Sequence, residues 1–198
     1  IGTDAWRIRP VTSNFNYNFT AVNTRSTSPN DVGGNTAVAS FNVLNYFTTF
    51  NVRGAHSAAE LNRQAAKIVA AIEGLNADVI GVMEIENNND GAIANLVSRL
   101  NATAGAGTYA YIPTGTVGTD QITVGIIYKP GRVTPVGMAQ ILTASGFTDP
   151  NNTGTARSRP AVAQTFDTII TGERFTVVVN HLKSKGSCPT SGADTDQN

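Results

Sequence analysis

Three polar residues stand where apolar runs of the sequence stop, and their side chains suit phosphate chemistry. Asn42 lies in SFNVLNYF, Glu84 in VMEIENN and His181 in VVVNHLKSK. Hydrolysis of a phosphodiester needs positive charge beside a non-bridging oxygen, and an oxygen-ligated Mg²⁺ or Mn²⁺ supplies it. Because strand ends feed the loops that carry sites in α/β proteins, Glu84 is the best candidate for a metal ligand. A glutamate that is merely solvated beyond a strand fits the same spacing.

Asn42 and His181 each allow two interpretations. Asn42 has apolar neighbours, so its amide is either a structural hydrogen-bonding group or part of a metal site. His181 is followed by Lys183 and Lys185, and an imidazole with two ammonium groups suits phosphate binding at close range. A lone histidine at a strand end is also commonly a surface residue.

Further charged residues precede two of the expected strands. Arg157 and Arg159 lie in ARSRPAV, and either guanidinium has the planar fork that binds phosphate oxygens in pairs. Asp120 and Gln121 lead into ITVGIIYKP, where Asp120 is suited to orient the imidazole of His181, because a carboxylate commonly fixes a histidine tautomer. Loop residues without a role are the alternative for all of them.

The composition indicates one globular domain with a local rather than global charge pattern. The chain has 198 residues, 40% of them hydrophobic, and 14 Lys+Arg balance 14 Asp+Glu. This length supports a substantial core, and no heptad, collagen-like or transmembrane pattern competes. A net charge of zero gives no basic excess of the kind that nucleic-acid binders usually show, so a polyanion site must be local.

Apolar periodicity predicts the elements that must position these residues. Ser57 and Glu60 form the S-x-x-E pattern of a capping box, and apolar residues at spacings of three and four predict a helix to Leu75. A second helix is expected around 93–100, and residues 144–156 are expected to be loop. Strands are expected at 37–44, 78–83, 109–112, 122–129, 161–166 and 175–180.

This order of elements indicates an α/β or α+β fold, in which a mixed sheet carries helices. Residues 1–36 are polar and interrupted by Pro10, Pro29 and Gly33-Gly34, so we interpret them as a linker or the tail of an upstream domain. The domain proper is expected to be 37–198. The single cysteine, Cys188, is either a free thiol or has a partner outside the chain.

The motifs SFNVLNYF, ADVIGVMEIEN, TDQITVGIIYKP, RSRPAVAQTF and NHLKSKGSCP follow one another over residues 37–190. In order and spacing they resemble secreted bacterial nucleases of the endonuclease/exonuclease/phosphatase superfamily, relatives of pancreatic-type deoxyribonuclease. The resemblance implies a four-layer sandwich of two mixed β-sheets flanked by helices, incomplete at the C-terminus, with its active site at one end.

The same resemblance implies roles for single residues. Glu84 and Asn42 become metal-site residues for Mg²⁺, with Mn²⁺ or Ca²⁺ as alternatives. His181 corresponds to the first of two active-site histidines and contacts the scissile phosphate, with Asp120 near it. Arg159 or Arg157 contacts phosphate, and the two fit the motif about equally.

The resemblance also implies missing parts. The later Gly-Asp-x-Asn and Ser-Asp-His segments are absent before Asn198. In that superfamily the second histidine activates the attacking water, so the isolated 198 residues are expected to turn over little substrate, and half of the second sheet is expected to be lacking. The resemblance further suggests that Cys188 pairs with a cysteine beyond Asn198.

These inferences lead to one expected function and two alternatives. The parent protein is expected to be a secreted or periplasmic endonuclease that hydrolyses DNA, with RNA as a further substrate. The first alternative is a sphingomyelinase- or phosphatase-type member of the same superfamily. The second is a secreted binding module without catalysis.

Overall fold

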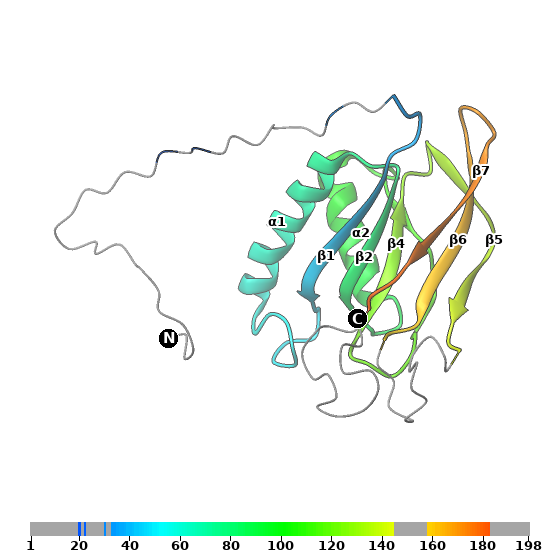
Figure 1. The fold of residues 1–198 in the computed structure, drawn as a ribbon. Coiled ribbons are helices and arrows are strands. Elements are labelled where there is room, and N and C mark those ends of the chain that lie inside the picture. Colours follow the sequence, from blue (N-terminus) through cyan, green and yellow to red (C-terminus); the bar gives the residue numbers. More distant parts are fainter. Residues whose placement is uncertain (1–19, 21, 23–29, 31–32, 145–157, 183–198) are drawn as a thin grey trace. The chain divides into compact units, whose positions relative to one another are not determined.

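The computed structural model of the chain divides into two compact units, Ile1–Asn30 and Asp31–Asn198. The structure describes residues 20, 22, 30, 33–144 and 158–182, and the helices and strands of these described residues lie in the second unit (Figure 1). The predictions made for Arg157, Lys183, Lys185 and Cys188, and most of the predicted loop at 144–156, fall outside these described residues.

Two sheets form the body of the second unit. In the first, the strand order is β1-β2-β4-β3, formed by β1 (Val38–Tyr46), β2 (Val79–Glu86), β4 (Ile122–Tyr128) and the short β3 (Ala110–Tyr111). β1 and β2 are parallel and the other pairs are antiparallel. The second sheet is antiparallel over its described strands, β5 (Val133–Leu142), β6 (Ala161–Thr168) and β7 (Arg174–Val179).

Helices α1 (Ala58–Leu75) and α2 (Gly91–Ala104) cover the face of the first sheet that points away from the second sheet (Figure 1). The predicted start of α1 is confirmed, because the Ser57 side chain accepts a hydrogen bond from the Glu60 backbone N–H at 3.3 Å. Glu60 itself bonds the backbone N–H of His56 at 2.8 Å, one residue earlier than a standard capping box. α1 ends at Leu75 and is followed by Asn76, which takes the left-handed conformation and caps the helix.

The first sheet has an apolar core on each side, so its central strands are buried on both faces. Alternate residues of β2 point to opposite sides: Ile80 and Val82 pack under the helices, whereas Val79 packs toward the second sheet. The helix-side core includes Leu61, Ile68, Ile72, Leu96 and Leu100, and the inter-sheet core includes Val124, Ile126, Val162, Phe166 and Val179. The predicted fold class, two face-to-face sheets with helices outside, is confirmed.

Gly81 permits the two sheets to approach closely. A Cβ atom at this position would lie 2.8 Å from Cγ2 of Val179 on β7. We therefore expect Gly81→Ala to lower the free energy of unfolding by about 1–3 kcal/mol through overpacking. Gly74→Ala in α1 is the control, because a Cβ there meets nothing within 4 Å, and it should raise stability by about 0.5–1 kcal/mol. Urea unfolding of both variants checks this pair, and equal effects would contradict it.

The sequence patterns did not predict β5. It contains Pro135 and Gly137, and its pairing with β6 shifts register between Val136 and Gln140. As an edge strand of the described sheet it tolerates a proline, whose missing N–H needs no ladder partner.

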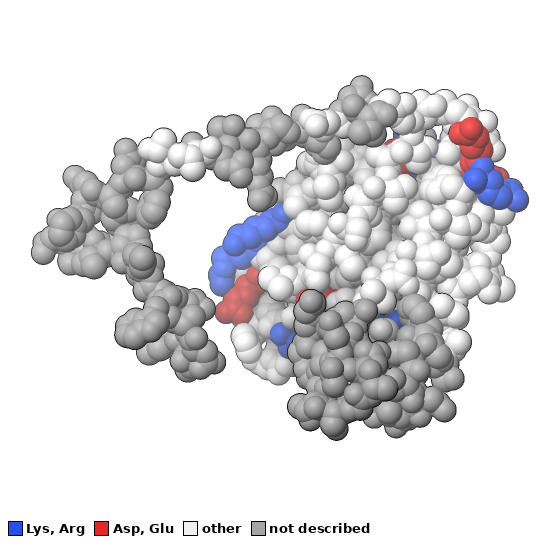
Figure 2. Space-filling view, in the orientation of Figure 1, with Lys and Arg blue, Asp and Glu red and all other residues white. Residues whose placement is uncertain are grey.

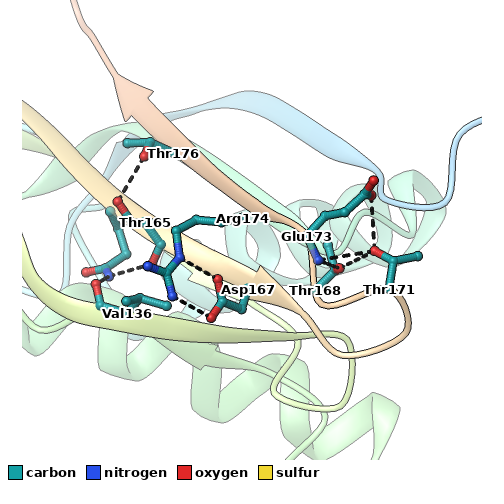
Figure 3. A network of polar contacts seen from close by, with 9 residues as sticks. Val136, Thr165, Asp167, Thr168, Thr171, Glu173, Arg174 and Thr176 are labelled. Atoms are coloured by element: carbon teal, nitrogen blue, oxygen red, sulfur yellow. Dashed lines mark hydrogen bonds and ion pairs between the residues drawn. The ribbon is translucent and has the colours of Figure 1, made fainter.

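Polar contacts fix the register of the second sheet (Figure 3). Arg174 and Asp167 form a two-point ion pair across the β6–β7 hairpin, with distances of 2.8 and 2.9 Å. Thr165 and Thr176 share a hydrogen bond of 2.9 Å on the same pair of strands. In the view of Figure 2, this hairpin carries one of the few charged groups on a mostly uncharged face.

β1 and β7 are edge strands of the described sheets, and a groove of about 350 Å³ runs between them. Val38 and Val178 at this groove are 53% and 51% exposed, so apolar surface is open there. Within the described residues, no helix combines the length and apolar character needed to cross a membrane.

Candidate functional site

The strand directions bring the predicted site residues to one end of the sandwich. β1 and β2 are parallel, so their carboxyl ends meet there, and antiparallel β4 begins there. In the second sheet β7 ends where β6 begins. This end lies at the bottom of Figure 1. The side chains near it come from Asn42, Glu84, Asp120, Arg159 and His181.

Glu84 lies where the hydrogen-bonding register of β2 shifts relative to both of its neighbouring strands. The β1–β2 register shifts between Asn42 and Tyr46, and the β2–β4 register shifts between Met83 and Ile85. Glu84 has φ +63°, in the left-handed region. A non-glycine residue there costs about 1–3 kcal/mol, and bulges of this kind redirect side chains beside active sites. The strained conformation is therefore a reason to assign Glu84 a function.

The carboxylate of Glu84 faces the imidazole of His181, with 3.8 Å between Oε1 and Nε2. Their side chains are 20% and 18% exposed. Burial lowers the pKa of His181, and the positive charges of Arg159 and, less strongly, Arg53 lower it further, whereas Glu84 and Asp120 oppose this. The net effect favours the neutral ring, and Nδ1 is buried without a hydrogen-bond partner among the described residues.

Asp120 has two guanidinium partners instead of the imidazole. Its Oδ2 lies 3.0 Å from Nη2 of Arg159, and its Oδ1 lies 3.5 Å from Nη1 of Arg53. Arg159 is 19% exposed, and its Nε is buried without a partner in the described part of the chain. Asp120 therefore acts on His181 through its charge, and its expected role in orienting the ring stays a prediction.

The arrangement can be compared with known proteins. The family model for the endonuclease/exonuclease/phosphatase family matches residues 48–186. The chain belongs to this family. Its members are hydrolases of phosphate esters, and they generally use divalent metal ions. The match includes Glu84, Asp120, Arg159 and His181.

Solved structures of other proteins resemble the chain in fold. A family protein from Bacteroides thetaiotaomicron shares the fold with TM-score 0.50 at 16% identity, over 77% of this chain and 52% of that one. A second, from Bacteroides vulgatus, has TM-score 0.49 and 16% identity over 75% and 52%. Humanized TDP2 of D. rerio has 0.47 and 17% over 75% and 51%.

The chain thus spans about half the length of these solved structures. A search of curated proteins found no significant match.

The donors at this end of the fold are oxygen atoms of the kind that bind divalent cations. Glu84 offers a carboxylate that accepts no hydrogen bond within the described residues. Asn42 is exposed, and its Oδ1 accepts the Leu44 N–H at 2.8 Å, which leaves one lone pair. Among the described residues no three His, Cys, Asp or Glu side chains cluster as a metal site. Mg²⁺ needs only one or two protein carboxylates, because water and substrate phosphate complete its shell.

Asn87, which the sequence patterns did not single out, holds the segment that carries Asp120. Its Nδ2 donates to the carbonyl oxygens of Val117 and Asp120, both at 2.9 Å, and its Oδ1 accepts the Val117 N–H at 2.9 Å. Its backbone N–H donates to Gln121. One amide therefore fixes the position of the Asp120 backbone.

Glu86, two residues after Glu84, anchors the loop after β1. Its Oε2 accepts hydrogen bonds from the Thr48 and Thr49 backbones at 2.7 and 3.1 Å, and from Asn88 at 2.9 Å. Burial raises the pKa of this carboxyl, but the hydrogen bonds from Thr49 and Thr48 outweigh burial and lower it overall. A glutamate so fully engaged is structural, in contrast to Glu84.

Glu86 should make folding sensitive to acid. Its folded-state pKa lies below the ordinary value of 4.5, so its contribution to stability is complete above that pH and is lost as the pH falls through the lowered value. At neutral pH, Glu86→Gln should cost about 1.5–3 kcal/mol through loss of charged hydrogen bonds. Urea unfolding at neutral pH and near pH 4 should show a smaller acid loss in the variant than in the wild type. Parallel losses would contradict this role.

Proposed function

We propose that the protein is a secreted, divalent-metal-dependent endonuclease that hydrolyses DNA, with RNA as a further substrate. The supporting observation is the meeting of Glu84, His181 and Arg159 at one end of the sandwich. The backbone of Glu84 is strained, and its carboxylate lies 3.8 Å from the largely buried imidazole of His181. The largely buried guanidinium of Arg159 adds positive charge near this imidazole. Secretion is proposed from composition and from the resemblance.

Each residue has a distinct proposed task. Glu84 and Asn42 would hold the cation, which when bound neutralises charge on a non-bridging phosphate oxygen. Neutral His181 offers one ring N–H to a phosphate oxygen, and Arg159 binds phosphate through its planar fork. None of these residues is assigned the task of accepting a proton from the attacking water.

A binding module without catalysis fits the site less well. Arg159 Nε and His181 Nδ1 are buried polar atoms without a partner among the described residues. Such atoms carry a desolvation cost, and a protein that no longer binds substrate has no reason to retain them together. A sphingomyelinase- or phosphatase-type member remains the alternative, since it would use the same residues.

A parallel assay separates the substrate classes. The product of the complete native gene is incubated in Mg²⁺ with supercoiled plasmid, RNA, sphingomyelin vesicles and an inositol phosphate. We expect nicking of plasmid and little lipid or monoester hydrolysis. Preferred hydrolysis of sphingomyelin or the monoester would replace the nuclease proposal, and the 198-residue chain alone should show no more turnover than its own Glu84→Ala variant.

A further inference from the structure

Arg53 reaches the same end of the sandwich from the loop between β1 and α1. Its Nη1 lies 3.5 Å from Asp120 Oδ1, while Arg159 occupies the other oxygen at 3.0 Å. The Arg53 side chain is 41% exposed against 19% for Arg159, and it has the smaller effect on His181. Arg53 thus lies at the rim of the site, with Asp120 between it and Arg159.

The loop that carries Arg53 is held in place by packing. A Cβ atom on Gly54 would lie 2.5 Å from the Asn45 carbonyl oxygen and 2.7 Å from Cβ of Phe47. Ala55 is buried, and its carbonyl accepts the Asn51 N–H at 3.4 Å. Since the residues that follow Arg53 are closely packed, the backbone that carries its guanidinium is held in position.

The bonding of Arg53 differs from that of arginines at the opposite end. Arg174 is engaged by both oxygens of Asp167, and Arg132 binds Asp78 at 3.0 Å and the Asn35 carbonyl at 3.1 Å. Arg53 has one long contact within the described residues. A guanidinium has five N–H donors, so most of those on Arg53 have no partner among the described residues.

The local charge favours an anionic ligand. Arg53 and Arg159 carry two positive charges against the one negative charge of their shared partner Asp120, and the second carboxylate nearby, that of Glu84, is the proposed ligand of the cation. A planar guanidinium binds a phosphate through two parallel hydrogen bonds, and a polynucleotide presents further phosphates beside the scissile one. We propose that Arg53 binds a second phosphate of a nucleic-acid strand, next to the phosphate that Arg159 and His181 contact.

This inference rests on the proposed nuclease function and makes Arg53 a residue that favours polymers over small phosphate esters. The competing explanation is that Arg53 only positions Asp120. The two differ in salt dependence, because each phosphate contact by a cation releases counterions and adds about 0.7–0.9 to the slope of log K against log salt. A purely structural partner of Asp120 does not change this slope.

Binding without turnover provides the test. The 198-residue chain is titrated in EDTA with a short fluorescein-labelled DNA duplex, and anisotropy gives Kd from about 50 to about 200 mM salt. The variants are Arg53→Ala, Arg53→Lys and the control Arg174→Ala, which removes another exposed arginine that is paired with an aspartate, in the β6–β7 hairpin. Thermal unfolding of each variant verifies the fold.

We expect Arg53→Ala to weaken binding and to reduce the salt slope by about 0.9, so that its deficit shrinks about threefold across this salt range. Arg53→Lys should retain most of the slope, and Arg174→Ala should match the wild type. Equal behaviour of Arg53→Ala and Arg174→Ala, or weaker binding with an unchanged slope, would overturn the inference alone. A wild-type chain without salt-dependent binding would also overturn the inference, whereas the nuclease proposal is decided separately by the plasmid assay of the complete gene product.

Discussion

Glu84→Ala is expected to lower the rate of phosphodiester hydrolysis at least about a thousandfold. The carboxylate is the charged donor of the proposed cation site, and charge stabilisation by a bound cation contributes several kcal/mol to the transition state. Glu84→Gln should lose nearly as much, because it keeps the shape and removes the charge. Initial rates on a labelled duplex in Mg²⁺ measure both. The control is Glu173→Ala, in the distant β6–β7 turn.

A glycine at position 84 should abolish activity without lowering stability. Glu84 has φ +63°, a conformation that glycine adopts without strain. Glu84→Gly is therefore expected to be inactive and yet to unfold at the same or a higher urea concentration than the wild type. A large fall in stability would show that Glu84 supports the fold, and an activity within tenfold of the wild type would remove Glu84 from the reaction.

His181→Ala is expected to reduce kcat by about 10²- to 10³-fold, the usual cost of removing one preorganised hydrogen-bond donor to a developing charge. The ring is largely buried, lies 3.8 Å from Glu84, and has an unpaired Nδ1 in the described part of the site. Its loss should therefore lower the rate of the chemical step more than it lowers the stability of the fold. Steady-state kinetics on the duplex substrate separate kcat from KM.

The other histidine of the chain, His56, provides the matched control. It is exposed, and its ring contacts Asn51 at 3.2 Å. His56→Ala should retain activity within a fewfold of the wild type. If the two alanine variants were equally active, the imidazole of His181 would have no part in the reaction.

Local signals predicted the first helix because they act within one turn. Ser57 caps the helix, and Asn76 ends it in the left-handed conformation that asparagine tolerates. The apolar run at 78–83 likewise predicted a strand buried on both faces, and Ile80 and Val79 occupy the two cores.

The sequence patterns failed where tertiary context decides. Pro135 and Gly137 weaken any strand prediction, yet β5 pairs with β6 around a register shift. The positive φ angles of Leu44, Asn45 and Glu84 arise from bulges in paired strands, which need a partner to exist. No residue type in VMEIE marks the bulge.

The gathering of the candidate residues at one end of the fold was predictable, but their contacts were not, and their roles in a reaction stay predictions. The motif order placed Glu84, Asp120, Arg159 and His181 at one end of the sandwich. That Asp120 binds two arginines could not be predicted, since Arg53 lies in a loop with no periodicity. The difference between Glu84 and Glu86 could not be predicted either, because it depends on which carboxylate accepts the hydrogen bonds of the Thr48 and Thr49 backbones.

The most direct measurement is conversion of supercoiled plasmid to open circles by the product of the complete native gene, with Mg²⁺ or EDTA, for the wild type and Glu84→Ala in parallel. The site described at the end of the sandwich predicts nicking by the wild type in Mg²⁺ alone, and none by the variant in either condition. A folded wild type that leaves plasmid intact, or nicking that survives Glu84→Ala, would contradict it.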